Sequence, residues 1–177
     1  DAVMGREFFQ KCAVAVALAL LLMIVYIALR FRVMDGWSAG VMAALVLLHD
    51  VIVVYATFVL CGFPINDSFI AVALTILGYS INATIVIFDR IRENMHGVKT
   101  AEDLKELVNV SVTQTLTRSI YTSLTTFITI AVLFIMGVST VREFALPIMV
   151  GIVCGGYSSV CLTGALWYTM KKRSLSK

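Results

Sequence analysis

Five long apolar runs dominate this chain, and each is long enough to cross a lipid bilayer. A helix needs about 20 mostly apolar residues to span about 30 Å of hydrocarbon. Hydrophobic residues make up 60% of the 177 residues and charged residues only 14%, which is more apolar surface than a soluble domain of this size can bury. We therefore expect an all-α integral membrane protein in which residues 1–177 form a bundle of five transmembrane helices. The predicted spans are Phe8 to Leu29, Ser38 to Cys61, Asp67 to Phe88, Ser119 to Met136 and Val141 to Tyr168.

Residues 95–118 are predicted to form a cytoplasmic loop and a surface helix. Thr100 and Asp103 stand at the spacing of a capping box, which marks a helix start. Apolar residues then recur at intervals of three or four, at Leu104, Leu107, Val108, Val112 and Leu116. This pattern indicates an amphipathic helix from Thr100 to Thr117. We expect it to lie on the membrane surface before the chain turns into the fourth span.

The distribution of Lys and Arg predicts the orientation of the chain. Of the 14 Lys and Arg residues, only Arg6, Lys11 and Arg142 fall on one side of the predicted membrane. Basic connections favour the cytoplasm. We therefore expect the N-terminus of this chain outside and its C-terminus in the cytoplasm.

Asp50 is the most costly residue in the predicted spans, because it stands near the centre of the second one. A central Asp costs about 2.5–3.5 kcal/mol on insertion scales and normally finds a partner inside a bundle. It is either a protonatable or ion-paired functional group, or a hydrogen-bonded neutral group that fixes helix packing. The neighbouring His49 could share a proton with Asp50 or simply pack with a satisfied ring.

Arg118 precedes a polar stripe in the fourth span. Thr122, Thr125, Thr126 and Thr129 share a helical face with it. Hydroxyl groups beside a cation suit an ion or proton path, and they equally suit hydrogen bonding between helices. The sequence leaves both interpretations open.

Small residues and cysteines in the remaining spans are predicted to have packing roles. Gly151, Gly155, Ser159 and Thr163 recur every four residues, a spacing that lets another helix approach closely. Four cysteines lie in or beside apolar runs at spacings that match no metal template, at Cys12, Cys61, Cys154 and Cys161. We expect no metal and no cofactor.

The third span carries the most distinctive run in the chain, GYSINATIVIFDRIREN, from Gly78 to Asn94. Polar residues stand among aliphatic ones in its first half, and a charged cluster follows. A helix with polar groups at membrane depth is typical of transport rather than of a passive anchor. The residues concerned are Tyr79, Ser80, Asn82 and Thr84, followed by Asp89, Arg90, Arg92, Glu93 and Asn94.

This run and several others resemble the membrane domain of the SecF family of bacterial protein-export proteins. The similarity covers about Gly5 to Tyr168, in the order that the family has. The matching stretches are Leu47 to Asp50, GYSIN, IVIFDRIREN, Gln114 to Arg118, Thr122 to Thr126, and Gly156 to Ser159.

The resemblance implies a fold and a function. Members of the family have six membrane helices, with an extracytoplasmic domain between the first two, so the first helix and that domain would be absent from this chain. The family belongs to a superfamily of proton-driven transporters. It implies a bacterial cell membrane protein that uses the proton gradient, or another ion gradient, to help move secreted polypeptides through the SecYEG channel beside SecD.

One position departs from the family pattern. The family usually has Asn followed by a presumed proton-carrying Asp, whereas here Ala83 follows Asn82. Coupling could rest on Asp50 with Arg118, on an acid of SecD, on a cation other than the proton, or be absent. Our hypothesis from the sequence is that Asp50 and Arg118 form a switching ion pair.

Two other functions compete with an export subunit. One is a small-molecule or ion permease of the same superfamily, and the other is a structural subunit without ion coupling, with which Ala83 is compatible. An enzyme is not expected, because the chain has no phosphate loop and no nucleophile–base pair. The small net charge of +3 gives no indication of nucleic-acid binding.

Overall fold

A computed structural model describes residues 2–98, 100–137 and 139–175, and its elements there are all helical. The predicted all-α fold is confirmed, with five helical runs long and apolar enough to cross a membrane. The elements are α1 (Ala2–Arg30), the short 3₁₀ helix η1 (Arg32–Met34), α2 (Gly36–Leu60), α3 (Asp67–Asn94), α4 (Ala101–Ile135), α5 (Ser139–Tyr157), the π-helical segment η2 (Ser158–Thr163) and α6 (Gly164–Leu175).

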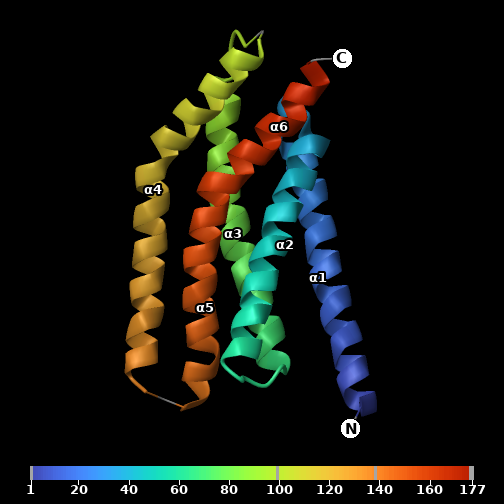
Figure 1. Ribbon diagram of the computed structural model, residues 1–177, viewed down its shortest axis with the longest axis vertical. Helices are drawn as coiled ribbons and strands as arrows, with labels where there is room; N and C mark the ends of the chain where they lie inside the picture. The colour runs from blue at the N-terminus through green and yellow to red at the C-terminus, as the bar shows by residue number, and fades with distance from the viewer. Residues whose placement is uncertain (1, 99, 138, 176–177) are drawn as a thin grey trace.

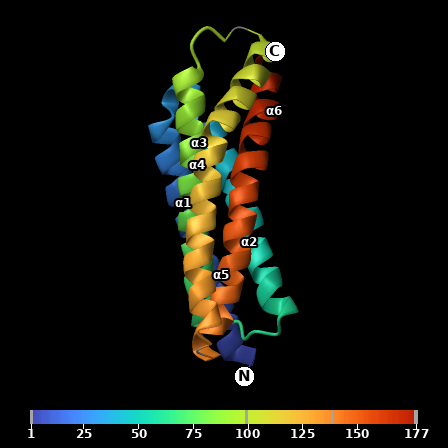
Figure 2. The same ribbon diagram turned by 90° about the vertical axis from the view of Figure 1, so that its left-hand side faces the viewer.

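The helices form an elongated bundle in which α2, α3 and α5 lie between α1 and α4 (Figure 1). Connections alternate between the two ends, and the N- and C-termini lie at opposite ends (Figures 1 and 2). The basic connections from α1 to α2 and from α3 to α4 lie at the same end as α6. The molecule therefore concentrates positive charge at the end that holds its C-terminus.

The fourth span differs from the sequence prediction. The expected surface helix, Thr100 to Thr117, is the first half of one continuous helix, α4, which runs 35 residues to Ile135. The capping box is confirmed: the Asp103 amide donates to Thr100 Oγ1 over 3.1 Å, and the Thr100 amide donates to Asp103 Oδ2 over 2.9 Å. Leu104 and Leu107 are buried in the bundle core, so the first part of the apolar stripe packs on protein, whereas Leu116 at its end is exposed. No Gly or Pro interrupts the helix before Arg118, which consequently lies in its interior.

The fifth span is one helical run with two irregularities. Pro147 lies inside α5, and η2 forms a π-helical stretch between α5 and α6. Such π segments are rare and often occur at functional sites. Here the segment buries Ser158, Ser159 and Thr163.

Two apolar clusters enclose a polar layer at the middle of the bundle. Ala43, Ile87 and Trp167 belong to the cluster near α6, and Val54, Ile76 and Ile152 belong to the cluster toward the opposite end. Buried polar residues lie between these positions on three elements: Asp50 on α2, Ser80 and Thr84 on α3, and Ser158 and Ser159 on η2.

The turn from α1 to α2 brings two helix backbones into contact. Asp35 adopts a left-handed conformation, with φ of 65°, and places Gly36 against Ala28. A Cβ at Gly36 would overlap the backbone carbonyl of Ala28. That carbonyl cannot rotate away as a side chain could, so α1 and α2 approach this closely only with Gly at this position.

We predict that Gly36→Ala destabilises the protein by about 1–3 kcal/mol, the usual cost of overpacking. Thermal unfolding of the purified protein in detergent measures the effect. Gly78→Ala is the matched control, because a Cβ there meets open space and Ala favours a helix by about 1 kcal/mol over Gly. Equal melting temperatures for the two variants would contradict the close packing of α1 on α2.

Candidate functional site

The carboxyl group of Asp50 lies at the centre of the polar layer and is fully buried. Ser80 on α3 donates a hydrogen bond to Asp50 Oδ2 over 2.5 Å, and Ser158 on η2 donates to the same oxygen over 2.9 Å. The Cys154 thiol on α5 donates to Oδ1 over 3.5 Å. One carboxyl group therefore joins α2, α3 and the α5–η2 run.

The π-helical segment η2 also bonds directly to α3, next to the contacts of Asp50. Ser159 Oγ donates to the backbone carbonyl of Ser80 over 3.3 Å and lies 3.3 Å from Thr84 Oγ1. A π turn rotates successive residues less than an α turn does, because each turn contains more residues. Two adjacent serines, Ser158 and Ser159, thereby both reach buried partners on α2 and α3.

The small residues of the fifth span face α2 and α3 within this chain. A Cβ at Gly155 would lie 3.4 Å from Ser80 Oγ and 3.6 Å from Asp50 Oδ2. At Gly151 it would lie 2.6 Å from the end of the Ile76 side chain. The close approach expected of a small-residue stripe therefore occurs here against the helices that carry Asp50.

His49 extends the cluster toward the surface of the bundle. Its Nδ1 lies 3.1 Å from Asp50 Oδ1 and 3.9 Å from Cys154 Sγ, and its side chain is 43% exposed. Metal-binding atoms of His49, Asp50 and Cys154 lie within 4.8 Å of one another. Cysteine spacing gave no sign of this grouping, because Cys154 is far from the other two residues in sequence.

The structure does not form the expected ion pair between Asp50 and Arg118. Within the described part of the chain, Asp50 has an ion-pair contact only with His49. Arg118 instead lines a cavity of about 120 Å³ between α3 and α4, together with Asn82 and Ala83. The pair does not form because the two groups contact different faces of α3. Ser80 points to α2 and η2, where Asp50 lies, whereas residues 82 and 83 line the cavity of Arg118 on α4.

The threonine stripe does not reach Asp50 either. Each hydroxyl donates to the backbone carbonyl four residues earlier in α4, at 2.8–2.9 Å. Three of the four side chains are exposed, and Thr122 also lines the Arg118 cavity, so the hydroxyl groups are satisfied within α4 rather than by another helix. The residues are Thr122, Thr125, Thr126 and Thr129.

Tyr79 lies on the same face of α3 as Asn82 and Ala83, and it bonds to α4. Tyr79 donates from its hydroxyl to Ser123 Oγ over 2.6 Å, which joins α3 to α4 beside the Arg118 cavity. Gly78, the first residue of the motif, is exposed, and a Cβ at this position would meet no atom within 4 Å.

The charged end of α3 acts as a clamp between helices. Asp89 pairs with Arg30 of α1 at 3.0 Å and with Arg92 at 3.3 Å, and Arg90 pairs with Glu93 at 2.9 Å. Asn94 donates to Ser111 and Gln114 of α4 at 2.9 and 3.0 Å. These contacts hold α1 and α4 to the same end of α3.

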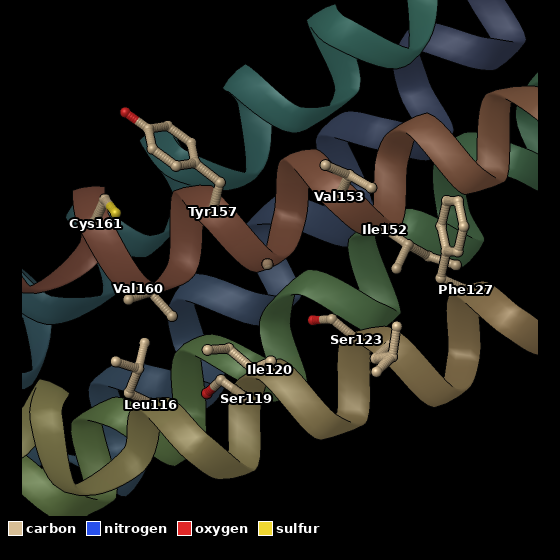
Figure 3. A pocket seen from close by; sticks show the side chains of 12 residues that line it. Leu116, Ser119, Ile120, Ser123, Phe127, Ile152, Val153, Tyr157, Val160 and Cys161 are labelled. Atoms are coloured by element: carbon tan, nitrogen blue, oxygen red, sulfur yellow. The ribbon is translucent and has the colours of Figure 1, made fainter.

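An apolar groove of about 420 Å³ runs between α4 and the α5–η2 run (Figure 3). Ile120 and Phe127 line one side of it, and Ile152, Val160 and Cys161 line the other. The groove lies apart from the Asp50 cluster and adds no charged group to it.

Comparisons with known proteins agree with this architecture. The family model described as protein export membrane protein SecD/SecF, C-terminal, matches residues 1–173. Protein translocase subunit SecF of Sebaldella termitidis is 43% identical over 171 residues, which cover 97% of this chain and 54% of that protein. Protein translocase subunit SecDF of Bacillus subtilis is 39% identical over 176 residues, which cover 98% of this chain and 23% of that protein.

A solved structure has the same fold. The crystal structure of SecDF from Thermus thermophilus, described as a translocon-associated membrane protein, aligns with a TM-score of 0.84 and 41% identity. The alignment covers 97% of this chain and 23% of that one. The chain thus spans about half the length of the SecF relative and about a quarter of the SecDF proteins.

We predict that Asp50→Ala lowers the free energy of unfolding by about 1–3 kcal/mol, because buried hydroxyl donors lose their acceptor. Asp50→Asn should cost less, since its amide keeps one acceptor oxygen. Thr125→Val serves as the control and should stay within about 0.5 kcal/mol of wild type. Thermal unfolding in detergent measures all three, and an unchanged Asp50→Ala protein would show that the cluster contributes nothing to stability.

Proposed function

The chain belongs to the SecD/SecF family of protein-export membrane proteins, and we propose that it is the membrane part of a SecF-type subunit that promotes protein translocation. The partner is SecD, either as a separate subunit or as the other half of one polypeptide, as in the SecDF relatives. The channel is SecYEG, and the substrate is a secreted polypeptide. The protein is located in the bacterial cell membrane, with its basic, C-terminal end in the cytoplasm.

The observation that carries an ion-driven mechanism is the fully buried Asp50 carboxyl, held by hydroxyl donors from two other elements. While the carboxyl is charged, Ser80 and Ser158 both donate to one oxygen. Arrival of a proton or another cation removes the net charge and changes which oxygen can accept. The hydrogen bonds between α2, α3 and η2 must then rearrange, and a local charge event becomes a shift of helices.

The membrane potential can supply the energy for this shift. Moving one charge through 100 mV is worth about 2.3 kcal/mol. That exceeds the net contribution of a typical hydrogen bond, about 0.5–1.5 kcal/mol. One cation per cycle can therefore exchange one hydrogen-bond arrangement at Asp50 for another.

A structural role without ion coupling is the second candidate, and Ala83 favours it. Position 83 lines the cavity of Arg118, where an acidic side chain would face the guanidinium. With Ala there, the residues that line the cavity include a cation and no acid. Under this alternative, changes at Asp50 affect export only as far as they reduce the amount of assembled protein.

We predict that Asp50→Asn in the full-length protein abolishes stimulation of export in cells, because Asn cannot exchange a proton or hold a cation by charge. Pulse-chase labelling of a secreted precursor measures the export rate. Thr125→Val is the control and should export at the wild-type rate, since its hydroxyl bonds only within α4. Quantifying the protein in membranes separates the two candidates: full export by Asp50→Asn at normal abundance would support the structural role.

We further predict that Ala83→Asp forms an ion pair with Arg118. Its strength is measured by a double-mutant cycle of thermal unfolding with Arg118→Gln, and a coupling energy of about 0.5 kcal/mol or more is expected for residues in contact. A coupling energy of zero would show that residues 83 and 118 do not share the cavity. The matched control is Ala56→Asp with Arg118→Gln, a pair on separate helices without a shared cavity, which should not couple.

A further inference from the structure

We propose that His49, Asp50 and Cys154 form a binding site for a divalent transition-metal cation of the Zn²⁺ class, at the point where α2 meets α5. Three observations support this site: the distances between the ligand atoms, their charges, and the serine hydroxyls that bond to Asp50. It does not depend on the proposed role in export, because its readout is metal binding itself.

The three ligand atoms are spaced as a tetrahedral metal requires. Zn²⁺ bonds to N, O and S at about 2.0–2.3 Å, so tetrahedral ligands stand about 3.4 Å apart for N and O and about 3.6 Å apart for pairs that include S. The observed separations are 3.1 Å from His49 Nδ1 to Asp50 Oδ1, 3.5 Å from Cys154 Sγ to Asp50 Oδ1, and 3.9 Å from Cys154 Sγ to His49 Nδ1. Each lies within about 0.3 Å of the tetrahedral value.

The two carboxylate oxygens of Asp50 contact different groups. Oδ2 accepts both serine hydroxyls, whereas Oδ1 faces the imidazole and the thiol. Hydrogen bonds to the far oxygen of a ligating carboxylate are the usual second layer of a metal site, and they fix the orientation of the ligand. Ser80 and Ser158 therefore hold Asp50 in the position that directs Oδ1 toward the other two ligand atoms, His49 Nδ1 and Cys154 Sγ.

Charge favours a dication at this depth. Metal binding displaces the thiol proton of Cys154, because a coordinating thiol is deprotonated, and that proton leaves to water. Carboxylate and thiolate together carry two negative charges, so a dication makes the site formally neutral. The imidazole then binds through Nδ1 with its proton on Nε2.

The set of donor types selects the class of metal. Imidazole, thiolate and carboxylate in tetrahedral array suit Zn²⁺, whereas Mg²⁺ and Ca²⁺ require oxygen ligands. The His49 side chain is 43% exposed, so the three ligands are open on that side, where a fourth ligand from outside the cluster can complete the tetrahedron.

Co²⁺ is the probe, because tetrahedral Co²⁺ bound to a thiolate absorbs visibly and shows a sulfur-to-metal charge-transfer band. The full-length protein is purified in detergent, treated with a chelator and titrated with Co²⁺ and then with Zn²⁺. We expect a charge-transfer band that saturates at one equivalent and disappears when Zn²⁺ displaces Co²⁺. Cys154→Ser should abolish the band.

Cys161→Ser is the matched control. It removes a thiol from the same helical run, but Cys161 lies on the apolar groove that faces α4 (Figure 3). This variant should keep the band. Absence of the band in the wild-type protein, or its persistence in Cys154→Ser, would overturn the proposal.

Two further measurements do not depend on the folding of Cys154→Ser. In the wild-type protein, Zn²⁺ should slow alkylation of Cys154, but not of Cys161, by at least tenfold, as measured by peptide mass spectrometry. Ser158→Ala, which leaves all three ligands in place, should weaken Zn²⁺ binding by about 10–100-fold, the usual effect of losing an outer hydrogen bond. Equal alkylation with and without Zn²⁺ would contradict the site in the unmodified protein.

Discussion

The burial of one carboxyl group determines how the centre of this bundle is built. Asp50 has no exposed surface, and a carboxyl group in such a place must find donors within the protein. The nearest helix backbones have already used their amides, so hydroxyl and thiol side chains supply the donors, from α3, α5 and η2. This requirement accounts for the close approach of Gly155, for the π-helical segment that directs Ser158 inward, and for a polar layer between two apolar clusters. The contacts that satisfy Asp50 are therefore the ones that join α2, α3 and the fifth span.

Helix α3 carries two polar sites on different faces. Successive residues in a helix are separated by about 100°, so residues 80 and 82 differ by about 200°. Ser80 consequently faces Asp50 while Asn82 faces Arg118, and Ala83, about 60° from Ser80, lies at the edge between the two faces and also lines the Arg118 cavity. Movement of α3 can link Asp50 to Arg118 in this arrangement, because the same helix contacts both sites. The clamp at the end of α3, where Asp89 pairs with Arg30 and Asn94 bonds to α4, links such movement to both outer helices.

The Asp50 carboxyl group takes part both in the proposed ion coupling and in the proposed metal site. Oδ2 is held by two serines, and Oδ1 is available to a cation, whether a proton or a metal ion. Both would remove negative charge at the same depth, and both would alter the bonds that join α2 to the fifth span. A metal would differ in one respect: it would also bind Cys154 and His49 and so fix α5 on α2, whereas a proton leaves those side chains free to move.

Local pattern was enough to identify the spans, the capping box at Thr100 and the family, because hydropathy, capping and motif order are properties of neighbouring residues. Local pattern also indicated that Asp50 needs partners, since the cost of a buried charge depends on its surroundings in the span. It could not identify those partners, because Cys154 and Ser158 are 104 and 108 residues away, and only packing decides which helix faces meet. For the same reason the amphipathic stripe of α4 could not distinguish a membrane surface from a protein face, and the expected pair of Asp50 with Arg118 does not form. The sequence by itself therefore determined which segments enter the membrane, and the tertiary structure decided which of their polar groups meet.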